Sequence, residues 1–389
     1  MTADAEAATR HHNNFDALRL LAALSVIFSH SFLIAEGTGA NDPLNRLTGN
    51  QCMLGLAGVF VFFAISGFLV TQSFEQTQAP LRYLAKRCLR IFPGYIVVLV
   101  LTAFVLGPLV TTLSLAEYLG RPEPYWYVLD NAVFSLKLHE LPGVWFVDNA
   151  VGLEVNGSLW SLGYEFEMYL MVLALGVLRL IKLPVCFVLL VLGMVCIHFD
   201  VKGFLGAWDI GGWNLGFFGD WGWMLGFFAA GMVLYKMRHL RIFHPNIALF
   251  AAIGLVLSGL YDGAFILWFP IFGCYLALYL ALNPKLPVLP AARFGDLSYG
   301  LYIYGWPSQQ TVIWLMHGHA PWWQVFLLAT LLASALAFLS WHLIEKRALS
   351  LKPGNGTWQG PGLGILPKAW RPKSPSAANS TSNTPRLSN

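Results

Sequence analysis

The stretch NFDALRLLAALSVIFSHS, residues 14–31, decides how this chain folds, because it is an apolar helix that carries two ionisable groups. Arg19 and His30 are eleven residues apart, which at about 100° per residue is about three turns plus about 20°. They therefore share one face, with about 16 Å of rise between them, roughly half the hydrocarbon thickness of a bilayer. Ionisable groups at such depths usually face a protein interior or a wet cavity. In the competing interpretation, His30 caps the helix near the far headgroups and Arg19 snorkels to the near ones.

The composition is that of a polytopic membrane protein. Of 389 residues, 57% are hydrophobic and only 11% are charged, whereas a soluble domain has about a quarter of its residues charged. The net charge of +4 is small and gives no reason to expect a nucleic-acid partner. We expect no nucleic acid and, from the apolar composition, a surrounding of membrane lipid. The five cysteines form no CxxC pair, so no metal site or disulfide framework is indicated. Because Arg19 and His30 interrupt the first apolar run, we expect a retained helix rather than a signal peptide.

Basic loops alternate with loops poor in Lys and Arg, as the positive-inside rule requires of a membrane protein. We therefore expect an all-α polytopic membrane domain over residues 14–350, with about ten transmembrane helices and both termini cytoplasmic. Residues 1–13 would be a cytoplasmic lead, and residues 351–389, rich in Pro, Gly, Ser and Asn, a disordered cytoplasmic tail. After the first helix, the expected spans are 54–71, 91–113, 159–178, 184–199, 213–235, 246–260, 265–282, 297–316 and 322–343. The third span would have Pro93 in its first turn, and residues 114–158 would form an extracytoplasmic loop with interfacial helices.

Two motifs follow the first helix. The segment GVFVFFAISGFL, residues 58–69, has Gly58, Ser66 and Gly67, which allow close helix packing; a packing face is more common than a site. In AKRCLRIFPGY, residues 85–95, Arg87 and Arg90 lie one helical turn apart at a membrane entrance. Two guanidinium groups at that spacing suit a phosphate. The alternative is ordinary topological charge or lipid-headgroup binding.

Two further motifs place polar groups in later spans. In SLWSLGYEFEMY, residues 158–169, Glu165 shares a helix face with Ser161 and Tyr169, whereas Glu167 faces elsewhere. Unpaired carboxylates inside a bilayer indicate function, although a structural partner such as Arg19 is the competing interpretation. The tyrosines of DLSYGLYIYGWP, residues 296–307, suit either hydrogen bonds in a cavity or a belt at the membrane interface.

Taken together, these stretches resemble the acyltransferase-3 family of bacterial integral-membrane acyltransferases over residues 14–350. The family's first motif is an arginine or lysine, ten intervening residues and a histidine, which Arg19 and His30 match. Its GVxxFFxISGFL, R-x-x-R, W-S-L-x-x-E-x-x-x-Y and S-Y-x-x-Y segments are matched at residues 58–69, 87–90, 160–169 and 298–302. One position departs, because many members carry a histidine just before W-P where this chain has Gly305. The chain resembles a stand-alone member without an appended esterase-like domain.

The resemblance implies an enzyme of the bacterial inner membrane, multi-pass, that transfers an acyl group to a hydroxyl of a cell-envelope carbohydrate. The donor would be acetyl-CoA or another acyl-CoA, the acceptor a carbohydrate or glycolipid, and no cofactor would be permanently bound. In such an enzyme His30 would be the general base, Glu165 would orient its imidazole, and Arg19 would fix a carboxylate or substrate oxygen. Arg87 and Arg90 would hold the CoA phosphates. The substrate-binding residues would be Asp16, Ser66, Trp160, Ser161 and Tyr299.

Two alternatives remain open at this point. An acyl-His30 intermediate would replace direct transfer, since histidine can act as a nucleophile. A transporter or flippase would bind a polar or glycan substrate at the same residues without covalent chemistry, because buried Arg, His and Glu also suit proton-coupled transport. The sequence has no clear internal repeat of the kind common in transporters.

Overall fold

A computed structural model of the chain describes most of residues 13–352. Within that range it leaves out residues 78, 135–139, 145, 147–148, 150, 153, 200–207, 211–212, 216–220, 241, 284 and 292, and between 208 and 215 it describes backbone only. The expected tail lies outside the described residues from 353 onward, and so do residues 1–12 of the expected lead. Residues 351 and 352, expected to belong to the tail, are described and follow the last helix directly.

Four helices in the described part of the chain are long and apolar enough to cross a membrane. The first two are α2 (Phe15–Glu36) and α4 (Leu54–Thr77). The third comprises α5 (Pro80–Leu101), the π turn η1 (Thr102–Leu106) and α6 (Gly107–Val110). The fourth comprises α16 (Trp322–Ser340), the π turn η4 (Trp341–Glu345) and α17 (Lys346–Ser350).

The remaining elements are shorter. They are α3 (Pro43–Leu47), α7 (Leu115–Leu119), α8 (Glu123–Ala132), the 3₁₀ turn η2 (Gly157–Leu159), α9 (Trp160–Val177), α10 (Leu183–His198), α11 (Trp221–Lys236), α12 (Pro245–Ser258), α13 (Ala264–Trp268), α14 (Phe272–Leu282) and α15 (Ser298–Leu315). A short antiparallel pair, β1 (Trp208–Ile210) with β2 (Trp213–Leu215), interrupts an otherwise helical chain. The helical class is thus confirmed, while the count of ten spans and the orientation of the termini stay predictions.

Three expected spans begin several residues away from the expected start or are broken, and those expected at 54–71 and 322–343 continue to Thr77 and Ser350. The helix expected to start at residue 91 starts at Pro80, because arginine and lysine are good helix formers, and Pro93 therefore lies inside α5 rather than in its first turn. The span expected at 213–235 starts only at Trp221, since residues 213–215 form β2. The span expected at 265–282 is broken into α13 and α14 around Pro270, a residue that disfavours helix at the position before it.

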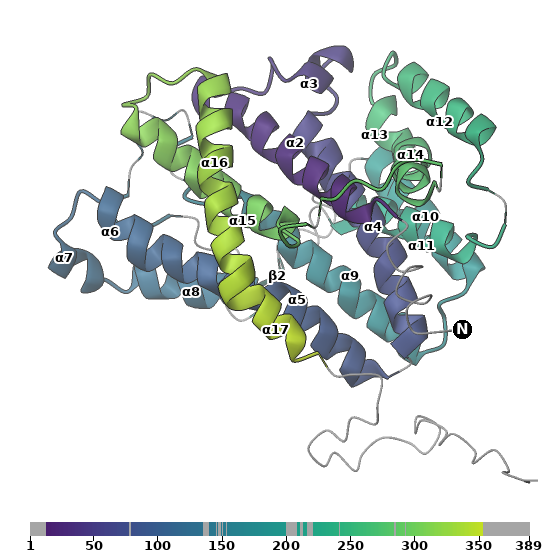
Figure 1. Cartoon of the computed structure of the whole chain (residues 1–389), viewed down its shortest axis with the longest axis horizontal. Coiled ribbons are helices and arrows are strands. Elements are labelled where there is room, and N and C mark those ends of the chain that lie inside the picture. Colours follow the sequence, from purple (N-terminus) through teal and green to yellow (C-terminus); the bar gives the residue numbers. More distant parts are fainter. Residues whose placement is uncertain are drawn as a thin grey trace, which may run out of the picture. The chain divides into compact units, whose positions relative to one another are not determined.

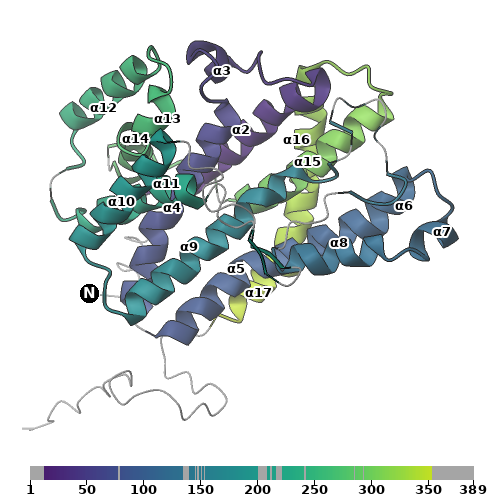
Figure 2. The ribbon, with the colours of Figure 1, turned by 180° about the vertical axis from the view of Figure 1, so that it is seen from behind.

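Helix α4 lies at the centre of the described part and packs against α2, α9 and α11 (Figures 1 and 2). Its glycines make these contacts possible. A Cβ at Gly58 would overlap Ser25 on α2, and one at Gly67 would overlap the backbone of Phe228 on α11. The 58–69 segment is therefore a packing face, as predicted, and Ser66 beside Gly67 keeps a polar side chain in the same region.

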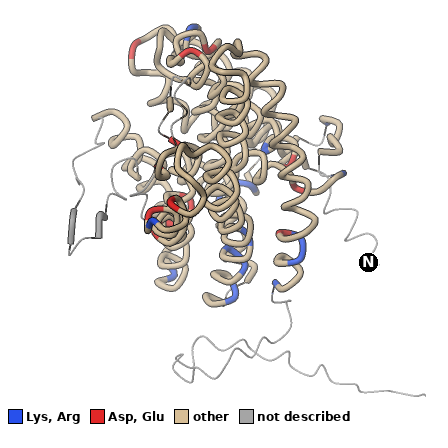
Figure 3. Tube along the Cα trace, turned by 90° about the vertical axis from the view of Figure 1, so that its left-hand side faces the viewer, with Lys and Arg blue, Asp and Glu red and all other residues tan. Residues whose placement is uncertain are grey.

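Lysine and arginine gather toward one end of the described helices, as the blue segments of Figure 3 show. The basic residues of α5 and α17, two elements in contact, are Arg82, Lys86, Arg87, Arg90, Lys346 and Arg347. The positive-inside rule expects such a gathering at the cytoplasmic face of a membrane protein.

Candidate functional site

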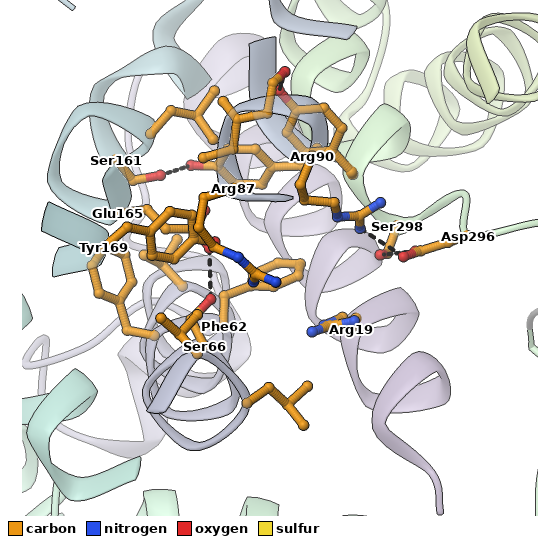
Figure 4. A pocket seen from close by; sticks show the side chains of 18 of the residues that line it. Arg19, Phe62, Ser66, Arg87, Arg90, Ser161, Glu165, Tyr169, Asp296 and Ser298 are labelled. Atoms are coloured by element: carbon orange, nitrogen blue, oxygen red, sulfur yellow. Dashed lines mark hydrogen bonds and ion pairs between the residues drawn. The ribbon is translucent and has the colours of Figure 1, made fainter. Parts of the chain in front are cut away.

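A cavity of about 310 Å³ lies between α2, α4, α5, α9, α15 and the end of the α16–α17 helix. Its charged lining consists of the cations Arg19, Arg87, Arg90 and Lys352 and the carboxylates Glu165 and Asp296. The guanidinium groups of Arg19, Arg87 and Arg90 all lie at this cavity (Figure 4). Segments far apart in the sequence therefore meet in one polar site, and its lining has more cations than carboxylates.

Glu165 is held in the cavity by two hydroxyl groups. Ser66 Oγ on α4 donates to Glu165 Oε1 over 2.6 Å, and Tyr169, one turn along α9, donates to the same oxygen over 2.5 Å. Hydrogen bonds to a carboxylate are stronger than those between neutral groups, so these two fix the position of its side chain. The competing interpretation that Arg19 pairs with Glu165 is not observed, since Arg19 Nη1 lies 3.7 Å from Asp16 Oδ1 instead.

Arg90 is neutralised by a partner 206 residues away in the chain. Its Nη2 donates to Asp296 Oδ2 over 2.6 Å, and its guanidinium lies 5.6 Å from the ring centre of Tyr299. Burial would raise the pKa of Asp296, but the neighbouring Arg90 and Arg19 lower it to about 2. Arg90 is thus an anchored part of the wall and has little charge left for a ligand.

Arg87 has a different environment although it lies one turn from Arg90. It donates a long hydrogen bond of 3.4 Å to Ser73 Oγ and lies over the rings of Tyr83 and Tyr169. Its Nε is buried without a hydrogen-bond partner. Among the described residues, neither Arg87 nor Lys352 forms an ion pair with a carboxylate. These two cations account for the excess positive charge.

The other expected substrate residues divide into two groups. Ser66, Ser161 and Tyr299 line the cavity, and Ser161 Oγ lies 2.6 Å from the hydroxyl of Tyr302. Asp16 and Trp160 are not part of the lining. The side chain of Asp16 is 51% exposed at the start of α2, and the ring of Trp160 packs against Tyr164 on its own helix.

Arg19 and His30 mark the two ends of one face of α2, called the α2 stripe below. His30 lies at the end away from the cavity and does not line it. Its ring packs edge-on against Trp306, with the ring centres 4.8 Å apart, and its Nδ1 is buried without a hydrogen-bond partner. Within the described part of the chain, no hydrogen bond joins His30 to Glu165, whose partners are Ser66 and Tyr169. The structure therefore does not bring together the histidine and the carboxylate that the sequence analysis paired.

Two adjacent side-chain amides of α15 tie this helix to its neighbours. Gln309 Nε2 donates to Ile27 O over 2.6 Å and to Ser31 Oγ over 2.7 Å, which ties α15 to α2. Gln310 Nε2 donates to the carbonyls of Val151 and Glu154, over 2.6 and 2.8 Å, which ties α15 to the segment that precedes η2. Gly305, the position where many family members carry a histidine, faces Ile27 so closely that a Cβ would come within 2.8 Å of it.

Sequence reasoning missed Asp296, Lys352, Gln309 and Gln310 as candidate site residues. The two adjacent glutamines offered a signal, because uncharged amides buried in an apolar helix also need partners. Asp296 was quoted in a motif but not assigned to Arg90, since no local pattern links them. Lys352 had no signal at all, because it was included in the expected tail.

Comparisons with known proteins place almost the whole described chain in one family. The family model for the acyltransferase domain, acyltransferase-3, matches residues 12–345. An "O-acetyl transferase" of Shigella phage Sf6 is 28% identical over 349 residues, which cover 87% of this chain and 96% of that protein. "Nodulation protein 10" of Rhizobium leguminosarum bv. viciae is 29% identical over 381 residues, covering 89% of this chain and 96% of that protein. No solved structure matches the chain.

Proposed function

Because the chain belongs to the acyltransferase-3 family, we propose that it transfers an acyl group from acyl-CoA to a hydroxyl of a cell-envelope carbohydrate. The family makes it an acyltransferase in a membrane. Acetyl is the proposed acyl group, in keeping with the name of the phage relative. The proposed location is the bacterial inner membrane, with the basic end of the helices toward the cytoplasm, where CoA is available.

The observation that carries the donor proposal is the excess positive charge of the cavity. Within the residues that the structure describes, Arg87 and Lys352 line it without a carboxylate partner, and the Nε of Arg87 is buried with no acceptor. An arginine of this kind suits the oxygens of a phosphate, which it can contact with two parallel N–H groups. The phosphates of CoA would occupy this end, and Arg90, held by Asp296, would shape the wall beside them.

The chemistry is proposed to take place farther along α2. Arg19 and His30 lie on one face about 16 Å apart along the helix axis, a separation of the length of the extended pantetheine arm of CoA. His30 would take the proton from the acceptor hydroxyl as its oxygen attacks the thioester carbonyl. A C–O bond forms, the C–S bond breaks, and the proton passes on to the CoA thiolate. Formation of an acyl-His30 intermediate is the stepwise version of this reaction.

In this proposal Glu165 and Arg19 act at the cavity rather than on the imidazole. Glu165, fixed by Ser66 and Tyr169, presents a charged acceptor to N–H or O–H groups of the bound donor. Arg19, on the opposite wall, would contact an oxygen of the substrate. Ser161 and Tyr299 would complete the wall between them.

The test is transfer of radiolabelled acetyl from acetyl-CoA by purified protein in nanodiscs, with lipid-linked glycans from the host envelope as acceptors. We expect label in an alkali-labile ester on the glycan, and loss of it in Arg87→Gln. The control is Arg347→Gln, which removes an exposed arginine of α17 outside the cavity lining. Acetyl-CoA that binds but is never consumed, together with movement of glycan across the bilayer, would instead show a flippase.

A further inference from the structure

Lys352 is the cavity residue that the family resemblance does not cover. It follows the last described helix by two residues and lines the cavity together with Leu349 and Trp341 of the same helical segment. The family match ends at residue 345, so Lys352 lies seven residues beyond it. The family model therefore does not itself assign Lys352 to the cavity.

The surroundings of Lys352 disfavour its positive charge. Burial, together with the neighbouring cations Arg90, Arg87 and Lys86 of α5, lowers its pKa from 10.5 to about 8. The charged groups that face it are Lys86, Arg87, Arg90 and, with the opposite sign, Asp296. Asp296 is already paired with Arg90. Like charges held this closely repel one another until an anion lies between them.

We infer that Lys352 and Arg87 together bind a phosphate group of the donor, and that Lys352 is a determinant of donor affinity and specificity. This inference rests on the proposed function, since it names two residues that would recognise the acyl-CoA. Arg87 and Lys352 are chosen because each lines the cavity without a carboxylate partner among the described residues. Arg90 is excluded because Asp296 already takes its charge.

The inference predicts that donor binding is linked to proton uptake. A bound phosphate raises the pKa of Lys352, so above about pH 8 the ligand must bring a proton with it. The affinity for the donor is therefore highest below pH 8, where the lysine of the free protein is charged. It falls as the pH rises above the pKa of about 8. Arginines stay charged throughout this range, so an arginine at position 352 would remove the fall.

The experiment measures acetyl-CoA binding to the full-length protein in nanodiscs by calorimetry at pH 7.0 and pH 9.5. We expect Lys352→Gln to weaken binding on the order of tenfold at pH 7.0, the loss of one charge-assisted contact. Lys352→Arg should bind like the wild type at pH 7.0 but lose little affinity at pH 9.5, which separates Lys352 from Lys86. The matched control is Lys346→Gln, an exposed lysine of α17 outside the cavity lining.

Each outcome decides between the two proposals. Wild-type-like binding by Lys352→Gln, in a protein with an unchanged thermal unfolding profile, would overturn the role of Lys352 and leave the donor proposal intact. Equal loss in Lys346→Gln would reduce the effect to general surface charge and would also overturn it. Inorganic pyrophosphate is the second probe: if it binds in a Lys352-dependent way while acetyl-CoA does not bind, the phosphate site stands and the CoA donor is wrong.

Discussion

The two ends of the α2 stripe have different constructions although one helix joins them. At the Arg19 end, helices from across the chain leave a cavity with hydroxyl groups, two carboxylates and an excess of cations. At the His30 end, the imidazole packs against Trp306, and Gln309 and Gln310 tie α15 to its neighbours. The first end has an excess of positive charge that suits an anionic ligand, whereas at the second the imidazole packs against an aromatic ring. The difference indicates that recognition and chemistry are separated along one helix, and three mutational experiments test that separation.

The largest effect is expected at His30. In His30→Gln, transfer should fall by the ~10²–10⁴-fold typical of a lost general base, because no other histidine lies at the α2 stripe. Acetyl-CoA affinity should stay within about twofold of wild type, since the phosphates would bind at the other end. The measurement is labelled acetyl transfer at saturating donor, with calorimetric binding on the same preparations.

The matched control is His319→Gln, which replaces an exposed histidine in the connection between α15 and α16. Full transfer activity in a well-inserted His30→Gln protein would end the catalytic role of His30. A parallel loss of donor binding would instead end the separation of the two regions.

An intermediate effect should distinguish Arg87 from Arg90 within the cavity. Arg87→Gln should weaken acetyl-CoA binding by about 1.5–3 kcal/mol, roughly ten- to a hundredfold, with little change in stability. Lysine at position 87 should restore binding only in part, because it lacks the planar fork. Arg90→Gln should instead lower the unfolding free energy by about 1–3 kcal/mol, because it leaves the half-buried Asp296 without its ion-pair partner.

A double variant checks the assignment of Arg90. Adding Asp296→Asn to Arg90→Gln should recover part of the lost thermal stability, since the unpaired charge is removed together with its partner. Should Arg90→Gln retain wild-type stability and bind donor as weakly as Arg87→Gln, both arginines would be ligand-binding residues, as the sequence analysis first predicted.

The smallest effect on activity is expected from the amides near His30. Gln310→Ala removes hydrogen bonds to Val151 and Glu154 and should cost about 1–3 kcal/mol of stability, because the buried amide of Asn149 also loses its acceptor, Gln310 Oε1. Donor affinity should not change, since the cavity lies at the other end of α2. Thermal unfolding with and without acetyl-CoA measures both quantities, and Gln76→Ala, at an exposed position near the end of α4, is the control. A large drop in donor affinity would show that the two regions are coupled.

The sequence predicted those parts of the site that depend on local spacing. The i, i+4 relation of Glu165 and Tyr169 is confirmed as a hydrogen bond, and the small residues around Gly67 are confirmed as a packing face. Pairings across the chain were out of reach, because Arg90 and Asp296 are linked only by the packing of α5 against α15. The expected partnership of His30 with Glu165 is not observed for the same reason, since two motifs of one family say nothing of the distance between the helices that carry them.

Boundaries failed where hydropathy and backbone preference disagree. The first turns of α5 are basic rather than apolar. The hydropathy pattern therefore placed the start of this helix eleven residues too late, at residue 91 instead of Pro80. The segment before α11 was included in a span because it is rich in Trp and Phe. The sequence Gly211-Gly212 between β1 and β2 was nevertheless a hairpin signal, since two glycines suit the left-handed turns that join such strands.

The π turn at Trp341–Glu345 would let the last helix lose one residue without turning its later side chains away from the cavity. A helix forms such a turn when it takes up one residue more than the α repeat allows, so that the flanking turns keep their faces. Removing one residue here should return the segment to an ordinary helix and still leave position 352 of this chain directed at the same wall. A relative that is one residue shorter at this point therefore need not have lost the terminal cation, and an alignment without a gap there would compare the wrong side chains.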